Sequence, residues 1–432
     1  LTFDEWKYSD DYEAIMKEFT NYQYEVRFLR AYFYFELIKR YRNIPFVLDV
    51  LAQNEANGVN PESYEKIAKF IVDECSDLAQ ILPVNYDNFS TKEKGRVTRA
   101  AAMALKSRVT LYMASPLFSE DSEDKWKQAA EAAYDIIKQK TDLGLDLVPY
   151  PQIFNDVNNQ KAEVILYRPT GESGDFEKAN FPIGVEGGKT STCPTQNLME
   201  AYDMKDGTPF VWNNQSNPYD NRDPRMKYTI VCNEMKWPVD PVEIWEGGTN
   251  GLPLQNATTT GYYLKKYVNN TISFEAGSTV TKKQHNWVLF RYGEILLNYA
   301  EAMINAFHDP NYKDAVYNMS AREAVNQIRG RTNISLPGFP SDITEKDFVK
   351  RLKNERRVEL AFEGHRFWDV RRWKELGQTA NIYGVKITKN NEVISYEKFL
   401  LETRAVTDNM YFYPIPNTER FKNPNLGQNP GW

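Results

Sequence analysis

The sequence contains few of the residues that build metal, redox or disulfide sites. Its 432 residues include three cysteines and three histidines. Cys75, Cys193 and Cys232 lie far apart without C-x-x-C spacing, and an odd number of cysteines cannot all pair with one another. The histidines show no regular ligand spacing, such as H-x₃-H. We therefore expect no metal site, no cofactor and no disulfide framework.

Long apolar runs are also missing. A membrane-spanning helix needs about 18 consecutive apolar residues, and the best candidate stretch, 295–307, is interrupted by Glu301. The chain opens at Leu1 and shows neither a basic n-region nor an apolar h-region, so no signal peptide is visible. We expect that the sequence starts inside a longer gene product.

Positive charge and catalytic motifs are scarce as well. The 53 Lys and Arg residues are outnumbered by 59 Asp and Glu, which gives a formal net charge of −6. Nucleic-acid binding draws on clustered Lys and Arg, so this balance does not favour it. No G-x-S-x-G motif occurs, and the glycines around Gly247 lack the Lys and the following helix of a phosphate-binding loop. The sequence therefore predicts no catalytic motif of these classes.

Aromatic side chains are what the sequence has in abundance. Its 9 Trp, 27 Tyr and 23 Phe outnumber the 53 Lys and Arg. With 41% hydrophobic and 26% charged residues, the composition is too apolar for a disordered chain and typical of a soluble folded protein. The functional question is which of these aromatics form the core and which lie on the surface.

The first long helical pattern spans residues 25–41. It contains neither Gly nor Pro and carries two apolar rows about 100° apart, one of them formed by Leu29, Phe33 and Leu37. A helix that is apolar on most of its circumference is buried on more than one side. We expect this helix to be packed in that way.

Further helical patterns fill the first and last thirds of the chain. Asn60 followed by Pro61 is typical of a helix N-terminus. The residues from Ser320 to Glu323 have the form of a capping box, and those from Thr344 to Asp347 repeat it. Two early helix pairs with short connections resemble a tetratricopeptide-like helical repeat. The expected helices span 61–82, 98–114, 124–140, 290–306, 321–331 and 345–362, and the chain after Gly377 is expected to be irregular.

Between residues 142 and 287 the pattern changes. Most of the Gly and Pro residues lie here, and short strand-like runs at 164–168, 228–232 and 261–268 are separated by turns. Long irregular segments in a compact domain usually carry a function. We therefore expect the binding residues in this insert.

Several segments resemble the SusD/RagB family of bacterial outer-membrane nutrient-binding lipoproteins. They are spread in order from residue 27 to the C-terminus, which makes the combination specific although each piece alone is modest. The segments are Arg27–Tyr32, Ile44–Val47, Pro194–Gln196, Met204–Gly207, Arg222–Arg225, Gly261–Leu264, Leu289–Leu297, Tyr299–Ala302, Glu355–Arg357, Glu363–Arg366 to Arg372-Trp373, Tyr413–Pro416 and Asn423–Trp432.

The resemblance implies a mainly α fold, a tetratricopeptide-like helical-repeat scaffold with a large irregular α+β and loop insert. It implies one domain, 1–432, in which helical pairs occupy 1–141, the insert 142–287, and helices with an extended tail 288–432. Members of the family usually carry an anchor Cys and helices before the motif that starts here at Arg27, and only 26 residues precede it in this sequence. We expect the family's N-terminal segment, with part of the sugar and transporter contacts, to be absent.

The resemblance also implies a function. It predicts a surface-exposed lipoprotein of the cell outer membrane that captures glycans or oligosaccharides without catalysis. The protein would deliver its ligand to a SusC-type TonB-dependent transporter and touch the membrane only through a lipid anchor absent from this chain. No nucleic acid partner is expected. The sequence does not identify the glycan.

One group of carboxylates allows two interpretations. Glu355, Glu359 and Glu363 are four residues apart on one helix face, with Arg366 and Arg372 nearby. Two carboxylates could form the acid/base pair of a glycosidase, but that chemistry needs them across a cleft. We favour an internal Arg–Glu network that braces the fold.

The insert supplies the positive signal for sugar binding. Sugars present flat C–H faces ringed by hydroxyls, so a site combines exposed Trp or Tyr rings with amides or charged groups. Trp212 is followed by Asn213, Asn214 and Gln215, with Tyr219 and Asp220 close behind; Trp237 and Trp245 lie further on. The predicted glycan-binding residues are Trp212, Asn213, Tyr219, Trp237 and Trp245.

Two other classes of function remain open from the sequence. One is a carbohydrate-active hydrolase, which would turn over an oligosaccharide. The other is a helical-repeat scaffold that binds only protein partners, which would bind no glycan.

Overall fold

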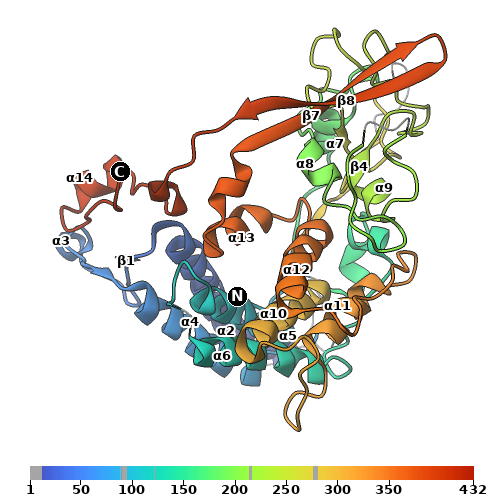
Figure 1. The fold of residues 1–432 in the computed structure, drawn as a ribbon. Helices are drawn as coiled ribbons and strands as arrows, with labels where there is room; N and C mark the ends of the chain where they lie inside the picture. Colours follow the sequence, from blue (N-terminus) through green and yellow to red (C-terminus); the bar gives the residue numbers. More distant parts are fainter. Residues whose placement is uncertain (1–11, 88, 90–94, 121, 214–216, 276–280) are drawn as a thin grey trace.

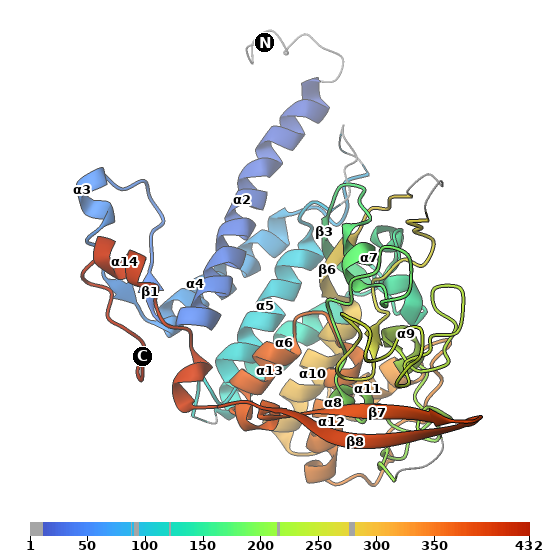
Figure 2. The same ribbon diagram turned by 90° about the horizontal axis from the view of Figure 1, so that it is seen from above.

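The structure is a computed structural model, and it describes residues 12–87, 89, 95–120, 122–213, 217–275 and 281–432. A row of helices forms its frame (Figures 1 and 2). Neighbours along this row pack against each other, and the last two helices pack on α10. The predicted mainly α, helical-repeat scaffold is confirmed. The row consists of α2 (Tyr12–Tyr41), α4 (Tyr64–Ile81), α5 (Arg99–Ala114), α6 (Glu123–Lys138), α10 (Tyr292–Phe307), α11 (Ala321–Arg329) and α12 (Glu345–Glu359).

Side-chain caps set the starts of these helices. Thr98 caps α5, and Ser320 with Glu323 forms the predicted capping box of α11. The predicted helix start at Asn60 and Pro61 is wrong. Pro61 and Glu62 form strand β2 (Pro61–Glu62), which pairs with β1 (Ile44–Pro45), and Ser63 caps α4 by accepting from the Lys66 N–H at 3.2 Å. A serine cap satisfies an N–H at the first turn, so the helix begins after it.

The long helix α2 is buried on one side only. Phe28, Phe35 and Ile38 are fully buried against the frame. Leu29, Phe33 and Leu37 are 41%, 58% and 41% exposed, so the expected packing of this second row is wrong for the described residues. The helix also starts earlier than the pattern predicted, at Tyr12, and runs for 30 residues.

The insert is built from short elements between long loops. Strand β3 (Val164–Pro169) pairs antiparallel with β6 (Asn286–Arg291), and β4 (Ile230–Val231) pairs with β5 (Tyr263–Leu264). The predicted strand at 164–168 is confirmed. The strands predicted at 228–232 and 261–268 are present but contain only two residues each. Phe290 and Arg291, which were expected to begin the helix at 290–306, belong to strand β6 instead. The short helices of the insert are η1 (Tyr150–Ile153), η2 (Asn158–Gln160), α7 (Asp175–Asn180), α8 (Gln196–Met199) and α9 (Met226–Thr229).

A long β-hairpin follows the last frame helices. Strands β7 (Asn381–Asn390) and β8 (Val393–Thr403) form a ribbon that crosses the insert (Figures 1 and 2). The expectation of an irregular chain after Gly377 is therefore wrong. Val385 of the ribbon donates its N–H to the Thr260 carbonyl at 3.0 Å, which fixes the hairpin to the insert. The smaller elements α13 (Arg366–Arg372) and η3 (Leu376–Thr379) precede the hairpin, and η4 (Asp408–Tyr411) and α14 (Asn417–Lys422) follow it; α3 (Gln53–Ala56) lies between β1 and β2, near α14 (Figure 1).

The hydrophobic core is divided into three clusters. The largest lies between the frame helices. A second joins the insert to the hairpin and includes Trp237, Tyr262 and Tyr396. A third, smaller cluster around Tyr150 and Tyr267 lies where the insert meets the segment after α11. None of the helices in the described part of the chain combines the length and apolar character needed to cross a bilayer.

Candidate functional site

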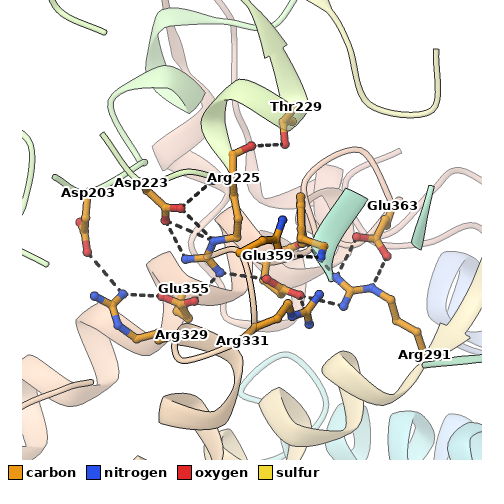
Figure 3. A network of polar contacts seen from close by, with 12 residues as sticks. Asp203, Asp223, Arg225, Thr229, Arg291, Arg329, Arg331, Glu355, Glu359 and Glu363 are labelled. Atoms are coloured by element: carbon orange, nitrogen blue, oxygen red, sulfur yellow. Dashed lines mark hydrogen bonds and ion pairs between the residues drawn. The ribbon is translucent and has the colours of Figure 1, made fainter. Parts of the chain in front are cut away.

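A network of buried ion pairs joins the insert to helix α12 (Figure 3). Arg225, at the start of α9, places Nη2 2.7 Å from Asp223 Oδ2. Its Nη1 lies 2.5 Å from Glu355 Oε1 and 2.9 Å from Glu359 Oε2 on α12. All four side chains are at most 3% exposed. Arg225 therefore braces the fold, as its place in the family-like motif predicted.

The network continues at the other end of the insert. Arg291, the last residue of β6, places Nη1 2.8 Å from Glu163 Oε1 and 2.9 Å from Glu359 Oε1. Its Nε lies 2.7 Å from Glu363 Oε2. Arg331 contacts both Glu163 and Glu359, at 3.0 and 2.9 Å. The two ends of the insert are thus held by the same row of carboxylates.

The carboxylates of this row are ionised and paired with cations. Burial alone would raise the pKa of Glu355, Glu359 and Glu363, but the surrounding cations outweigh it and lower each pKa. Each group is therefore ionised and occupied by arginine donors. The interpretation as a bracing network is confirmed by these contacts.

The insert contains a cavity of about 390 Å³. Its lining comes from separate segments of the chain: the loop after η1, the segment from α9 to Trp237, the chain after β5 and the chain before β6. The residues concerned include Pro151, Phe154, Asn155, Asp156, Tyr228, Trp237, Lys265, Lys266, Tyr267, Asn269, Asn270, Thr271, Lys283 and His285.

Aromatic rings form much of the wall of this cavity. Tyr228 is half-buried, and its hydroxyl accepts from Asn333 Nδ2 at 3.3 Å. Trp237 is only 7% exposed, and the Lys265 ammonium lies 4.9 Å from its ring centroid. Tyr267 belongs to the third hydrophobic cluster beneath the cavity. The wall therefore offers an accessible tyrosine ring beside a largely covered tryptophan.

Polar groups line the rim. Asn155, Asn270 and Thr271 are exposed. Asn269 Oδ1 accepts from the Thr271 N–H at 3.0 Å and from its hydroxyl at 2.7 Å, which fixes this turn. Asp156 carries a carboxylate 3.4 Å from the Lys283 ammonium. The rim thus combines amide, hydroxyl and charged groups within one opening.

The floor of the cavity is tied to the buried network. The Lys266 ammonium lies 2.8 Å from Glu363 Oε1 and donates to the Tyr150 hydroxyl at 3.0 Å. Burial lowers the pKa of Lys266 to about 8, against the opposing effect of Glu363. Because its charge is buried and paired, this lysine is a structural part of the floor rather than a mobile contact.

Of the predicted sugar-binding residues, Trp237 lines this cavity and the other four lie outside its lining. Trp212 is half-buried and meets Phe210 edge to face, with ring centroids 6.4 Å apart. Trp245 is half-buried, and the Lys389 ammonium of the hairpin lies 4.6 Å from its ring. Both tryptophans pack on the second hydrophobic cluster.

The remaining predicted residues lie near Trp212 in sequence. Tyr219 meets Tyr262 and Tyr396 edge to face at 6.2 and 5.3 Å, and its hydroxyl oxygen is buried. This ring therefore points into the second hydrophobic cluster. Asn213 is exposed. Asn214 and Gln215, which the sequence grouped with it, lie outside the described residues.

Sequence reasoning missed most of the cavity lining. Tyr228 and Asn155 were not singled out, because neither stands in a recognisable local pattern. The run Asn269-Asn270-Thr271 could have been recognised, because Asn-rich polar runs that directly follow a strand-like segment are typical of turns. Within the described residues, no group of three or more His, Cys, Asp or Glu is placed to hold a metal ion.

Comparison with known proteins identifies related chains. A curated relative, SusD-like protein P2 of Formosa agariphila, is 29% identical over 163 residues, which cover 36% of this chain and 28% of the relative. The match therefore spans less than a third of that relative's length.

Solved structures match over nearly the whole chain. A SusD-like protein from Bacteroides fragilis is 27% identical with a TM-score of 0.78, and the match covers 95% of this chain and 79% of that one. A SusD-like carbohydrate-binding protein from the same species is 27% identical with a TM-score of 0.77, covering 94% and 79%. The family model described as the SusD family matches residues 153–432. This match covers more than half of the chain and most of the cavity lining, and the chain therefore belongs to the SusD family.

Proposed function

We propose that the protein is a non-catalytic glycan-binding protein that holds an oligosaccharide in the cavity of the insert. The observation that carries the proposal is the lining of this cavity, where Tyr228 and Trp237 stand beside Asn155, Asn270 and Thr271. Its volume of about 390 Å³ lies in the range of small-molecule sites, about 300–1,000 Å³. A tyrosine ring can stack on a sugar face while the amides bond to its hydroxyls.

The comparisons support this reading at the level of the family. One solved relative at 27% identity is described as a carbohydrate-binding protein. We extend the proposal to the system that uses the glycan: a surface-exposed outer-membrane lipoprotein that passes its ligand to a SusC-type TonB-dependent transporter. The anchor and the transporter contact are part of this extension, and both rest on the family.

Binding without hydrolysis is favoured by the placement of the carboxylates. A glycosidase needs two carboxyl groups flanking the scissile bond. Asp156 is the one carboxylate in the cavity lining within the described residues. Glu355, Glu359 and Glu363 are occupied by the buried network.

Replacing Tyr228 with alanine tests the site. A panel of plant, fungal and host-mucin oligosaccharides is first titrated calorimetrically against the wild-type protein. For every uncharged glycan that binds, we expect Tyr228→Ala to weaken affinity about tenfold, since truncation of an aromatic contact at the centre of a site typically costs at least that much.

The matched control is Tyr383→Ala. Tyr383 is also half-buried, and a lysine ammonium, that of Lys398, lies 4.5 Å from its ring, as Lys227 lies 5.4 Å from that of Tyr228. It stands on the hairpin, outside the cavity lining. Equal affinities for Tyr228→Ala and wild type would remove the cavity from the proposal. Turnover of a bound glycan would favour a hydrolase, and binding of no glycan would favour a protein-binding scaffold.

A further inference from the structure

A second cavity, of about 820 Å³, lies along helix α12. It is bounded by α12, the start of α13, the turn after it and the loop that follows α8. Lys346, Lys350, Lys353 and Arg357 line it from α12, and Arg366 lines it from α13. The spacing of the four α12 residues, i, i+4, i+7 and i+11, places them on one helix face. The cavity therefore has a basic stripe along one wall.

Two arginines of this wall have no ion-pair partner among the described residues. Arg357 Nη2 donates to the Asn197 carbonyl at 2.9 Å, and Arg366 Nη2 donates to Gln378 Oε1 at 2.9 Å. These bonds orient both guanidinium groups but leave their charges unpaired. Arg366 thus departs from the expected network, whereas Arg372 joins it through Asp369 and Glu301.

Several fully buried arginines, such as Arg225, Arg291 and Arg356, each contact at least one carboxylate. Buried Arg222 instead donates to main-chain carbonyls and does not face the second cavity. Burial and, next, the charge of Arg366 lower the pKa of Arg357 to about 10, which leaves it protonated at neutral pH. Two like charges therefore face one cavity, and an anion between them would relieve their repulsion.

Most acidic groups of the lining are already engaged elsewhere. Glu200 lies 2.8 Å from the Lys398 ammonium, and Glu375 lies 2.5 Å from that of Lys353. Asp203 lies 3.6 Å from Arg329 and 3.8 Å from Arg351. Asp347 accepts from the Thr344 hydroxyl at the first turn of α12. None of these carboxylates forms an ion pair with Arg357 or Arg366, although the charge of Glu200 acts on Arg357 and that of Glu375 on Arg366 at longer range.

We propose that this cavity binds the carboxylate of an acidic sugar unit between Arg357 and Arg366. Guanidinium groups recognise carboxylates through paired, planar hydrogen bonds, and a fixed guanidinium loses little freedom in forming them. The volume admits more than the carboxylate alone, so the uncharged part of the ligand is held in the same cavity. That the carboxylate belongs to a glycan rests on the proposed function, whereas the anion site itself does not.

The test compares acidic saccharides with uncharged counterparts. Tetragalacturonate and a hyaluronan tetrasaccharide are titrated calorimetrically against the wild-type protein, alongside fully methyl-esterified tetragalacturonate and citrate. We expect at least one acidic saccharide to bind, its affinity to fall as salt is raised, and the ester to bind at least tenfold more weakly. Arg357→Gln and Arg366→Gln should each reduce the affinity for the acidic saccharide at least tenfold.

Further measurements separate loss of binding from loss of stability and separate the two cavities. Arg404→Gln removes an exposed guanidinium, paired with Glu402 on the hairpin, and should leave the affinity unchanged. The melting temperatures of Arg357→Gln and Arg366→Gln should stay close to that of the wild type, because relief of the repulsion between the two charges offsets the lost hydrogen bond to Asn197 or Gln378. In a Tyr228→Ala background, Arg357→Gln should reduce the affinity for the acidic saccharide by the same factor as in the wild type. The proposal for each cavity can therefore fail independently of the other.

Three outcomes would overturn the proposal. The first is that neither acidic saccharide binds to the wild type at millimolar concentration and low salt. The second is an affinity for the acidic saccharide that is unchanged in both Arg357→Gln and Arg366→Gln. The third is binding of citrate as tight as that of the saccharides with the same dependence on Arg357, which would assign the site to free carboxylate anions instead.

Discussion

Arg291 and Glu359 are separated by 68 residues in the chain, yet Arg291 Nη1 donates to Glu359 Oε1 at 2.9 Å in the buried interior. Arg291 also donates through Nη2 to the main-chain carbonyl of Glu359 at 2.9 Å. One residue ends a strand of the insert and the other closes helix α12. The contact therefore joins the insert to the helical frame.

Replacing Glu359 should destabilise the fold strongly. Glu359→Gln keeps the shape of the side chain but removes the charge that Arg225, Arg291 and Arg331 share. Removing one partner of a buried ion pair leaves uncompensated buried charge, which costs about 3–5 kcal/mol. Urea unfolding followed by circular dichroism measures this loss.

The matched control for Glu359 is Glu402→Gln. Glu402 pairs with Arg404 at 3.1 Å, and both side chains are about half exposed. An exposed pair contributes about 1 kcal/mol or less. Similar losses for the two variants would mean that the buried network does not contribute more than a surface pair.

Glu301 should make stability depend on pH in the acid range. Burial alone would raise its pKa, but Arg372, with Nη2 2.7 Å from Oε2, and the Trp373 indole N–H lower the pKa to about 2. A folded-state pKa below that of the unfolded chain stabilises the fold above about pH 4.5, and this contribution disappears as the pH falls from 4.5 towards 2. The contribution of Glu301 ionisation to the free energy of unfolding is about 3 kcal/mol at most.

The difference in unfolding free energy between wild type and Glu301→Gln should therefore shrink as the pH is lowered from 6 to 3. Denaturant titrations at several pH values measure it. Glu419→Gln is the control, since its partner Lys422 lies 3.0 Å away in an exposed pair of α14. A difference for Glu301→Gln that stays constant across this range would contradict the prediction.

Gly261 should tolerate no side chain. Its φ of +83° favours glycine, and a Cβ there would lie 2.5 Å from the carbonyl oxygen and Cγ1 of Val385 on the hairpin. Gly247 has a similar φ of +87° but no heavy atom within 4 Å of such a Cβ. Gly247→Ala measures the backbone strain alone, about 1–2 kcal/mol.

Gly261→Ala adds steric overlap to this strain and should cost about 1–3 kcal/mol more than Gly247→Ala. Thermal unfolding of both variants measures the difference. Because the overlap is with the hairpin, hydrogen exchange in β7 should also become faster in Gly261→Ala only. Equal melting temperatures for the two variants would show that the hairpin moves away without cost.

The helical frame was predictable because its signals are local. Ser320 and Thr344 mark helix starts within four residues, and the apolar periods lie inside single helices. The hairpin was missed although its signal is present: Val385, Ile387 and Tyr396 are buried at alternating positions on either side of a short polar turn. Polar residues on the outer face of a two-stranded ribbon made this stretch look irregular.

The cavity was harder to predict for a physical reason. Its walls come from segments more than a hundred residues apart, so Tyr228 meets Asn155 and Lys283 only through the tertiary fold. A tryptophan in a loop selected Trp212, Trp237 and Trp245 alike. Trp237 lines the cavity and is also buried in the second hydrophobic cluster, whereas Trp212 and Trp245 are half-buried against that cluster. The role of all three in glycan binding stays a prediction.

The buried row of ion pairs has an entropic consequence for ligand capture. Arg225 and Arg291 are anchored to the same helix, and separating any of these charges from its partner would cost several kcal/mol. Thermal motion of the insert is therefore restricted at both of its attachment points. For the proposed sugar site, we therefore expect rearrangements on binding to be confined to the loops between them, such as the turn at Asn269 and Asn270. The loss of conformational entropy on binding would then come from these few residues and from the sugar rather than from the frame.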